Sequence, residues 1–138
     1  MDTAAFGSTE MEMLWLSIVL GIAQILLAAL FSVGKRGLPW GIGPRDHAPA
    51  PLGLTGARIE RASRNFLDTF PFFLGAVLIA NTLNKHGAQT ATGAQLYFWA
   101  RVAYLPAYVF GVPVLRTLIW AASLVGIGMV LRGVWPGM

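Results

Sequence analysis

The sequence predicts an all-α membrane protein whose chain forms a bundle of four transmembrane helices. Of its 138 residues, 56% are hydrophobic and only 12% are charged, and the mean hydropathy is +0.63. A soluble domain is about 25% charged, so roughly half of the expected charge is missing. The run from 13 to 34 contains no charged residue. It exceeds the ~20 residues that a membrane-spanning helix needs.

The four expected helices are separated by turns that are rich in glycine, proline or polar residues. The loop 35–57 follows the first helix, and its glycines and prolines exclude a long helix there. Thr55 is the expected N-cap of the second helix. A chain of 138 residues suits one domain rather than two. We expect a single domain over 1–138, with helices at about 13–34, 57–83, 94–110 and 114–131.

Basic residues set the expected orientation in the membrane. The loop 35–57 contains Lys35, Arg36 and Arg45, whereas no Lys or Arg precedes it. By the positive-inside rule, this loop is cytoplasmic and the N-terminus lies outside. The turn between the third and fourth helices then returns to the cytoplasmic side.

The composition also argues against several kinds of site. The net charge is +4, but several basic residues lie within or beside apolar runs, which disfavours a nucleic-acid-binding surface. The chain has no cysteine, so disulfides, thiolate metal sites and a cysteine nucleophile are excluded. His47 and His86 are far apart in the sequence, and two histidines alone make a poor metal site. We therefore expect neither a nucleic-acid partner nor a metal.

A polar stripe marks the start of the second expected helix, in a segment otherwise suited to lipid. Residues three, four and seven apart share one face of a helix. The residues that obey this spacing are Arg61, Arg64, Asn65 and Asp68. Charge inside a membrane helix is costly, so this stripe should face a partner, a cavity or a ligand.

The third expected helix carries a second polar stripe. One face holds, at intervals of four, three and four residues, Tyr97, Arg101, Tyr104 and Tyr108. An interfacial tyrosine belt with a structurally paired arginine is one interpretation, but belts cluster at the membrane surface and this stripe covers about three turns. For Arg101, a structural pairing with Glu60 or Asp68 and a ligand contact remain equally open. Tyr104 and Tyr108 favour a ligand.

A further cation, Arg116, opens the fourth expected helix. The chain direction places it near the cytoplasmic face, together with the start of the second helix and the end of the third. The cations of these segments are Arg58, Arg61, Arg64, Arg101 and Arg116. Glu60 and Asp68 are too few to neutralise them. The surplus predicts an anionic ligand held by bidentate arginine contacts.

Several segments have a recognisable pattern: Glu60-Arg-Ala-Ser-Arg-Asn-Phe-Leu-Asp-Thr-Phe-Pro-Phe72, Ala100-Arg-Val-Ala-Tyr-Leu-Pro-Ala-Tyr108, Gly111-Val-Pro-Val-Leu-Arg116 and Gly41-Ile-Gly-Pro-Arg-Asp46. The first resembles the Glu-Arg-x-x-x-Asn-x-x-Glu pattern, followed by proline, of the MAPEG family, the membrane-associated proteins in eicosanoid and glutathione metabolism. The next two look like that family's third helix and the turn after it. The last looks like the loop of its bacterial branch. The resemblance covers the chain from about Gln24 to about Val130.

The resemblance implies four-helix subunits assembled as a homotrimer in the bacterial inner membrane, with glutathione bound between adjacent subunits near the cytoplasmic side. Matched position by position, the glutathione-binding residues are Arg61, Arg64, Asn65, Asp68, Tyr104 and Tyr108. Asp68 stands where the family usually has the longer Glu. Arg116 resembles the arginine assigned to the glutathione thiol. From the chemistry of the phenol group, we expect Tyr104 or Tyr108 to donate a hydrogen bond to the same sulfur, with Arg116 and Tyr108 as the catalytic residues. Arg101 joins the binding set through its place on the second stripe.

The expected function is a glutathione-dependent transferase or peroxidase, with glutathione as co-substrate. Arginine forks suit the carboxylates of glutathione, and a nearby cation favours its thiolate. The second substrate is a lipophilic electrophile or a lipid hydroperoxide that arrives from the membrane lipids. A non-enzymatic lipid- or glutathione-binding membrane protein on the same fold is the main alternative. A small transporter is a weaker one, because no chain of acidic residues crosses the membrane.

Overall fold

A computed structural model describes residues 5–137 and shows an all-α protein. Its helices are α1 (Thr9–Arg36), α2 (Leu38–Ile42), α3 (Gly53–Thr82), α4 (Ala88–Val109) and α5 (Pro113–Val134). The long helices match the expected segments, and α3 and α4 continue through Pro71 and Pro106. The short α2 lies in the basic loop, in keeping with the exclusion of a long helix there.

Helix starts differ most from the sequence prediction. The start of α4 at Ala88, rather than at residue 94, follows from a cap in which the backbone N–H of Gly87 donates to Thr90 Oγ1 at 2.9 Å. The polar residues that suggested a turn therefore form the first turns of α4. The prediction of Thr55 as an N-cap is wrong, because α3 begins at Gly53 and Leu52 takes the cap position.

The helices differ in their suitability for a membrane. Among the described residues, α1 and α5 are long and apolar enough to cross one. The N-terminus of α1 is capped by Ser8, whose Oγ accepts a hydrogen bond from the backbone N–H of Met11 at 3.2 Å. The polar stripes of the sequence fall on α3 and α4 instead, so these two helices position the candidate site.

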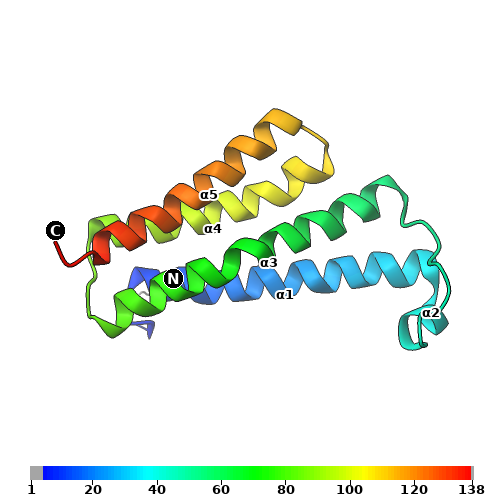
Figure 1. The fold of residues 1–138 in the computed structure, drawn as a ribbon, viewed down its shortest axis with the longest axis horizontal. Helices are drawn as coiled ribbons and strands as arrows, with labels where there is room; N and C mark the ends of the chain where they lie inside the picture. The colour runs from blue at the N-terminus through cyan, green and yellow to red at the C-terminus, as the bar shows by residue number, and fades with distance from the viewer. Residues whose placement is uncertain (1–4, 138) are drawn as a thin grey trace.

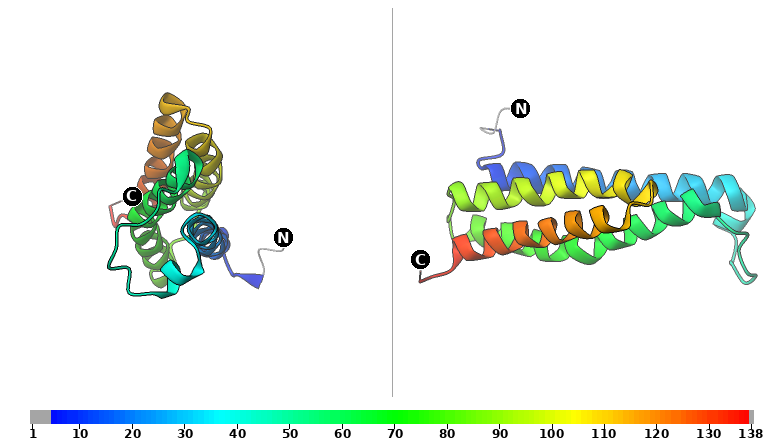
Figure 2. Two further views of the ribbon diagram at one scale, coloured as in Figure 1. Left: turned by 90° about the vertical axis from the view of Figure 1, so that its right-hand side faces the viewer. Right: turned by 90° about the horizontal axis from the view of Figure 1, so that it is seen from above.

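The helices run along one long axis as two antiparallel pairs (Figures 1 and 2). α1 packs beside α3, and α4 forms a hairpin with α5. The loop after α1 and the α4–α5 turn lie at one end, and the described chain ends lie at the other (Figure 1). The main hydrophobic cluster occupies the half with the chain ends, where Phe73 of α3, Tyr97 of α4 and Val130 of α5 are fully buried. Apart from Tyr97, the residues of the polar stripes lie outside this cluster, towards the other half.

Glycines let α4 and α5 approach each other closely. A Cβ atom added at Gly93 would lie 2.6 Å from the carbonyl oxygen of Gly126, and one at Gly126 would lie 2.6 Å from that of Gly93. Side chains at these positions would force the helices apart. The α4–α5 hairpin is therefore tightly joined, and it carries the tyrosines of α4 and Arg116 of α5 as one unit.

Candidate functional site

Side chains one helical turn apart connect α3 to α4. Arg61 Nε donates a hydrogen bond to the hydroxyl oxygen of Tyr108 at 3.1 Å. One turn further along α3, Asn65 Oδ1 accepts a hydrogen bond from Arg101 Nη2 at 2.9 Å. Half of the first predicted stripe thus meets the second stripe directly.

Arg101 is the most deeply buried cation of the site, with 1% of its surface exposed. Its guanidinium carbon lies 4.4 Å from the ring centre of Tyr104 and 5.6 Å from that of Phe66. Its Nε and Nη1 atoms have no hydrogen-bond partner, and it forms no ion pair within residues 5–137. A buried charge normally has a partner. Arg101 is therefore a cation with unused capacity to bind an anion.

The contacts continue from Arg101 to α5. The rings of Tyr104 and Tyr108 are 5.6 Å apart, and the guanidinium carbon of Arg116 lies 4.7 Å from the ring centre of Tyr108. Tyr108 therefore lies between two arginines, Arg61 on α3 and Arg116 on α5. We call the connected set the arginine–tyrosine row, and its members are Arg61, Asn65, Arg101, Tyr104, Tyr108 and Arg116.

Two predicted binding residues lie outside this row. Arg64 forms an ion pair with Glu60 one turn earlier, and 69% of its side chain is exposed. Asp68 is exposed and forms no ion pair with another described residue. The first stripe therefore divides: Arg61 and Asn65 turn towards α4, while Arg64 and Asp68 remain on the open surface of α3.

One tyrosine and one arginine near the row have structural roles. Tyr97 stacks on Phe73 with ring centres 4.0 Å apart, and its hydroxyl lies 3.1 Å from Thr69 Oγ1, so it belongs to the core. Arg58 Nη1 donates to the carbonyl oxygen of Val109 at 3.0 Å and caps the end of α4. The sequence reasoning counted Arg58 as a surplus cation, because only the fold reveals that the end of α4 lies beside it.

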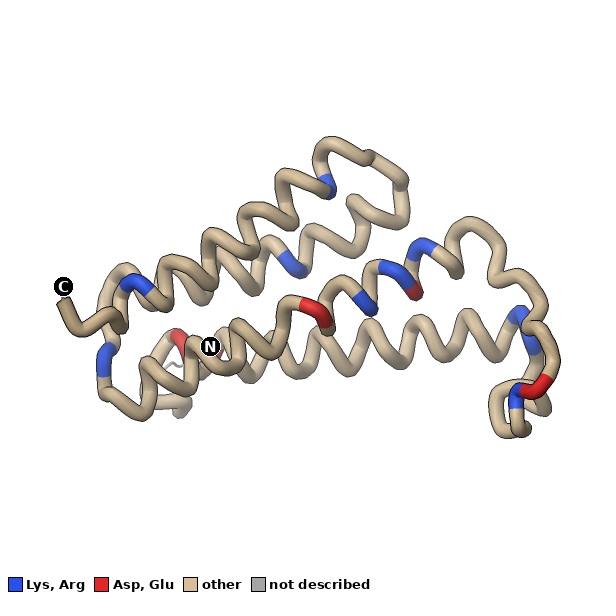
Figure 3. The backbone as a smooth tube through the Cα atoms, viewed as in Figure 1, with Lys and Arg blue, Asp and Glu red and all other residues tan. Residues whose placement is uncertain are grey.

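Positive charge gathers in the half of the molecule that contains the row. Most Lys and Arg residues lie between the α1–α3 loop, the α4–α5 turn and the adjoining parts of α3, α4 and α5 (Figure 3). Residues 5–137 contain no cluster of His, Asp and Glu that could hold a metal ion. The row therefore offers guanidinium groups and phenol hydroxyls, which suit an anionic organic ligand.

Comparisons with known proteins agree with this architecture. The MAPEG family model matches residues 13–134, which include every residue of the row and all four long helices in nearly their full length. Neither the curated proteins nor the solved structures contain a significant match to the chain. A family model that covers this much of the sequence is sufficient for the assignment. The chain belongs to the MAPEG family, whose members are membrane-associated.

Proposed function

We propose that the protein is an integral membrane glutathione-dependent transferase or peroxidase. The observation that carries this proposal is Arg101, a fully buried guanidinium with two unpartnered nitrogens in a row of further arginines and tyrosines. An anion with several carboxylates satisfies such a row better than a structural ion pair does. Family membership supports glutathione as that anion.

The charged groups of glutathione match the charges of the site. Arg61 and Arg101 suit its carboxylates, because guanidinium groups bind carboxylates through paired hydrogen bonds. Asp68 suits its amine, since this carboxylate is exposed and has no ion-pair partner among the described residues. Arg64, which is mostly exposed, supplies a further cation at the open surface of α3.

Tyr108 and Arg116 are the proposed catalytic residues. Tyr108 accepts a hydrogen bond from Arg61, so its own hydroxyl proton remains available to donate to a sulfur atom. The guanidinium carbon of Arg116 lies 4.7 Å from the centre of the Tyr108 ring and supplies positive charge there. A nearby cation lowers the pKa of a thiol from about 8.5 towards neutrality. The resulting thiolate attacks a lipophilic electrophile or a lipid hydroperoxide. Tyr104, whose ring centre lies 5.6 Å from that of Tyr108, is the neighbouring phenol.

The proposed setting is a bundle of four transmembrane helices in the bacterial inner membrane, assembled as a homotrimer. Large apolar side chains are exposed along the helices, among them Leu26 of α1, Phe72 of α3, Trp99 of α4 and Leu118 of α5, as expected for contact with lipid or with other copies. We place the N-terminus outside and the loop 35–57 in the cytoplasm, because this loop contains Lys35, Arg36 and Arg45. The row then lies near the cytoplasmic face.

Calorimetric titration of glutathione into the purified protein, followed by a conjugation assay with a generic electrophile, tests the proposal. We expect saturable binding and turnover. Arg61→Gln should weaken binding, whereas Arg45→Gln, which removes the same charge from the loop, should not. Binding without turnover would instead support the alternative of a non-enzymatic glutathione-binding protein, and absence of binding would refute both.

A further inference from the structure

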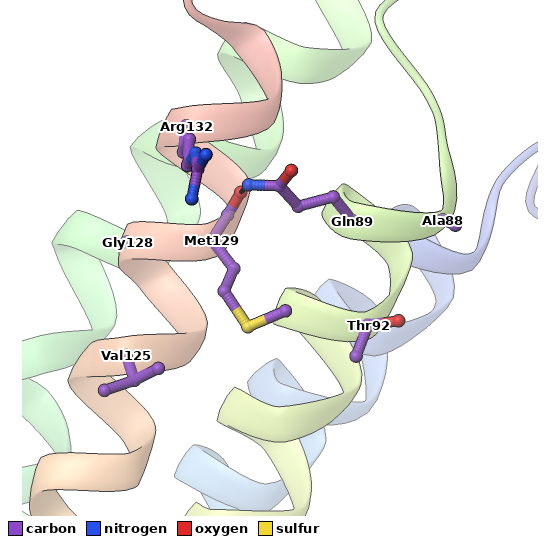
Figure 4. A pocket seen from close by; sticks show the side chains of 7 residues that line it. All are labelled: Ala88, Gln89, Thr92, Val125, Gly128, Met129 and Arg132. Carbon is purple, nitrogen blue, oxygen red and sulfur yellow. Dashed lines mark hydrogen bonds between the residues drawn. The ribbon is translucent and has the colours of Figure 1, made fainter.

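A groove lies between the start of α4 and the end of α5 (Figure 4). These helix ends lie at the end of the molecule opposite the α4–α5 turn and the arginine–tyrosine row (Figure 1). Its floor is formed by Val125, Gly128 and Met129 of α5. Gln89 and Thr92 of α4 line the facing wall, and Arg132 lies above the floor, one turn nearer to the end of α5 (Figure 4).

The floor of the groove is apolar and open. A Cβ atom added at Gly128 would have no atom within 4 Å, unlike one at the tightly packed Gly126. The amide of Gln89 reaches across to the other helix, where its Nε2 lies 3.4 Å from the carbonyl oxygen of Met129. The groove is therefore bordered at one end by polar groups and lined along α5 by apolar residues.

The upper end of the groove is positively charged. Arg132 is exposed and forms no ion pair with any residue in the described part of the chain. It also borders an adjoining hollow that is lined by Lys85 and His86. The first turn of α1 brings two carboxylates to this end, and both are buried: Glu12 is 6% exposed, and Glu10 is 2% exposed. Glu10 is occupied by the hydroxyl of Thr90 and by His86 Nδ1 at 3.3 Å. The exposed charge around the groove is therefore cationic.

We propose that this groove binds an anionic phospholipid, with the phosphate at Arg132 and an acyl chain on the floor formed by Val125, Gly128 and Met129. The order of polarity along the groove carries the inference: the cation lies in the last turn of α5, and the apolar floor lies further into the helix. A phospholipid has the same order from headgroup to tail. Arginine is well suited to a phosphate through paired hydrogen bonds.

Native mass spectrometry of the detergent-purified, delipidated protein tests this site. The ligands are phosphatidylglycerol, zwitterionic phosphatidylcholine, and glycerol phosphate as a headgroup without tails. We expect the unmodified chain to bind phosphatidylglycerol at least about tenfold more tightly than either of the others, a difference of about 1.4 kcal/mol.

Two variants address the two ends of the groove separately. Arg132→Gln should lower the affinity for phosphatidylglycerol by about tenfold, and Arg45→Gln, which removes the same charge at the opposite end, should not. Gly128→Leu fills open space on the floor and should abolish phospholipid binding. Gly75→Leu, which places the same side chain in open space on α3, is its control.

Several results would overturn the proposal. Equal affinities for phosphatidylglycerol and phosphatidylcholine would show that the groove binds lipid through apolar contacts alone. An affinity for glycerol phosphate equal to that for phosphatidylglycerol would show that the groove binds only the anion. A change of oligomeric state in Gly128→Leu, but not in Gly75→Leu, would assign the groove to a contact between copies of the chain. None of these results depends on glutathione turnover, because Arg132 and Gly128 lie outside the arginine–tyrosine row.

Discussion

Replacement of Arg101 by methionine separates the cost of a buried cation from its use in binding. In the ligand-free protein, the variant removes two buried unpartnered donors, which cost about 1–3 kcal/mol each. It also removes one charge-assisted hydrogen bond to Asn65, worth about 1.5–3 kcal/mol, and stacking on Tyr104, worth about 0.5–2 kcal/mol. These contributions nearly cancel, so the free energy of unfolding should change by no more than about 1 kcal/mol.

Glutathione should reveal the difference between the two proteins. At a concentration of 100 times the dissociation constant, a ligand stabilises the unmodified chain by about 2.7 kcal/mol. If Arg101→Met weakens binding tenfold, the same concentration stabilises the variant by only about 1.4 kcal/mol. Thermal unfolding in detergent, followed by circular dichroism with and without glutathione, measures both quantities. Arg101→Lys keeps the charge but lacks the planar fork, so glutathione should stabilise it by an amount between these two values.

One result would refute this reasoning. Removal of one partner from a buried ion pair destabilises a protein by about 3–5 kcal/mol. If Arg101→Met causes a loss of that size without glutathione, Arg101 already has an anionic partner in the ligand-free protein. Asp68 or a second copy of the chain would then supply that partner, and the surplus of cations would no longer indicate a ligand.

Three further predictions concern catalysis and packing. Arg116→Ala and Tyr108→Phe should each lower turnover of a generic electrophile by about tenfold, the equivalent of one unit of thiol pKa, while calorimetric glutathione binding persists; unchanged turnover would remove that residue from the catalytic role. Gly126→Ala should lower the free energy of unfolding by about 1–3 kcal/mol, because its Cβ would meet the backbone of α4. Gly128→Ala, in open space, should not lower it, and equal melting temperatures of the two variants would contradict the close helix contact. Arg58→Gln should lower the free energy of unfolding by about 0.3–2 kcal/mol, because the cap at the end of α4 is lost. An unchanged free energy of unfolding in chemical denaturation would exclude that cap.

The sequence was sufficient for the helices because their signals are local. Apolar runs and the turns that separate them predict the four long helices, and the residue patterns of the second and third helices already resemble those of the family that the chain belongs to. The start of α4 was harder to predict from the sequence. It depends on the cap between Gly87 and Thr90, and on the contact of Thr90 with Glu10, which is distant in the sequence.

The candidate site was predictable to the level of helix faces. Helical spacing identified the stripe of Tyr104 and Tyr108. Tyr104 lies against Arg101 of its own helix, and Tyr108 contacts Arg61 of α3 and Arg116 of α5. Spacing alone could not divide the first stripe, because Arg61 and Arg64 lie only three positions apart on one face. Which of them reaches Tyr108 depends on how α3 is rotated against α4, and that rotation is set by packing in the other half of the molecule.

The uneven distribution of apolar packing makes the two halves of the bundle unequal in strength. The half with the chain ends is held by a continuous hydrophobic cluster. In the other half, α3 and the α4–α5 hairpin are linked by polar contacts such as Arg61 to Tyr108 and Arg101 to Asn65. Polar links exchange partners at little cost when a ligand offers equivalent ones. We therefore expect α3 and the α4–α5 hairpin to separate more easily in the polar half than in the apolar half when an anionic ligand competes for these contacts.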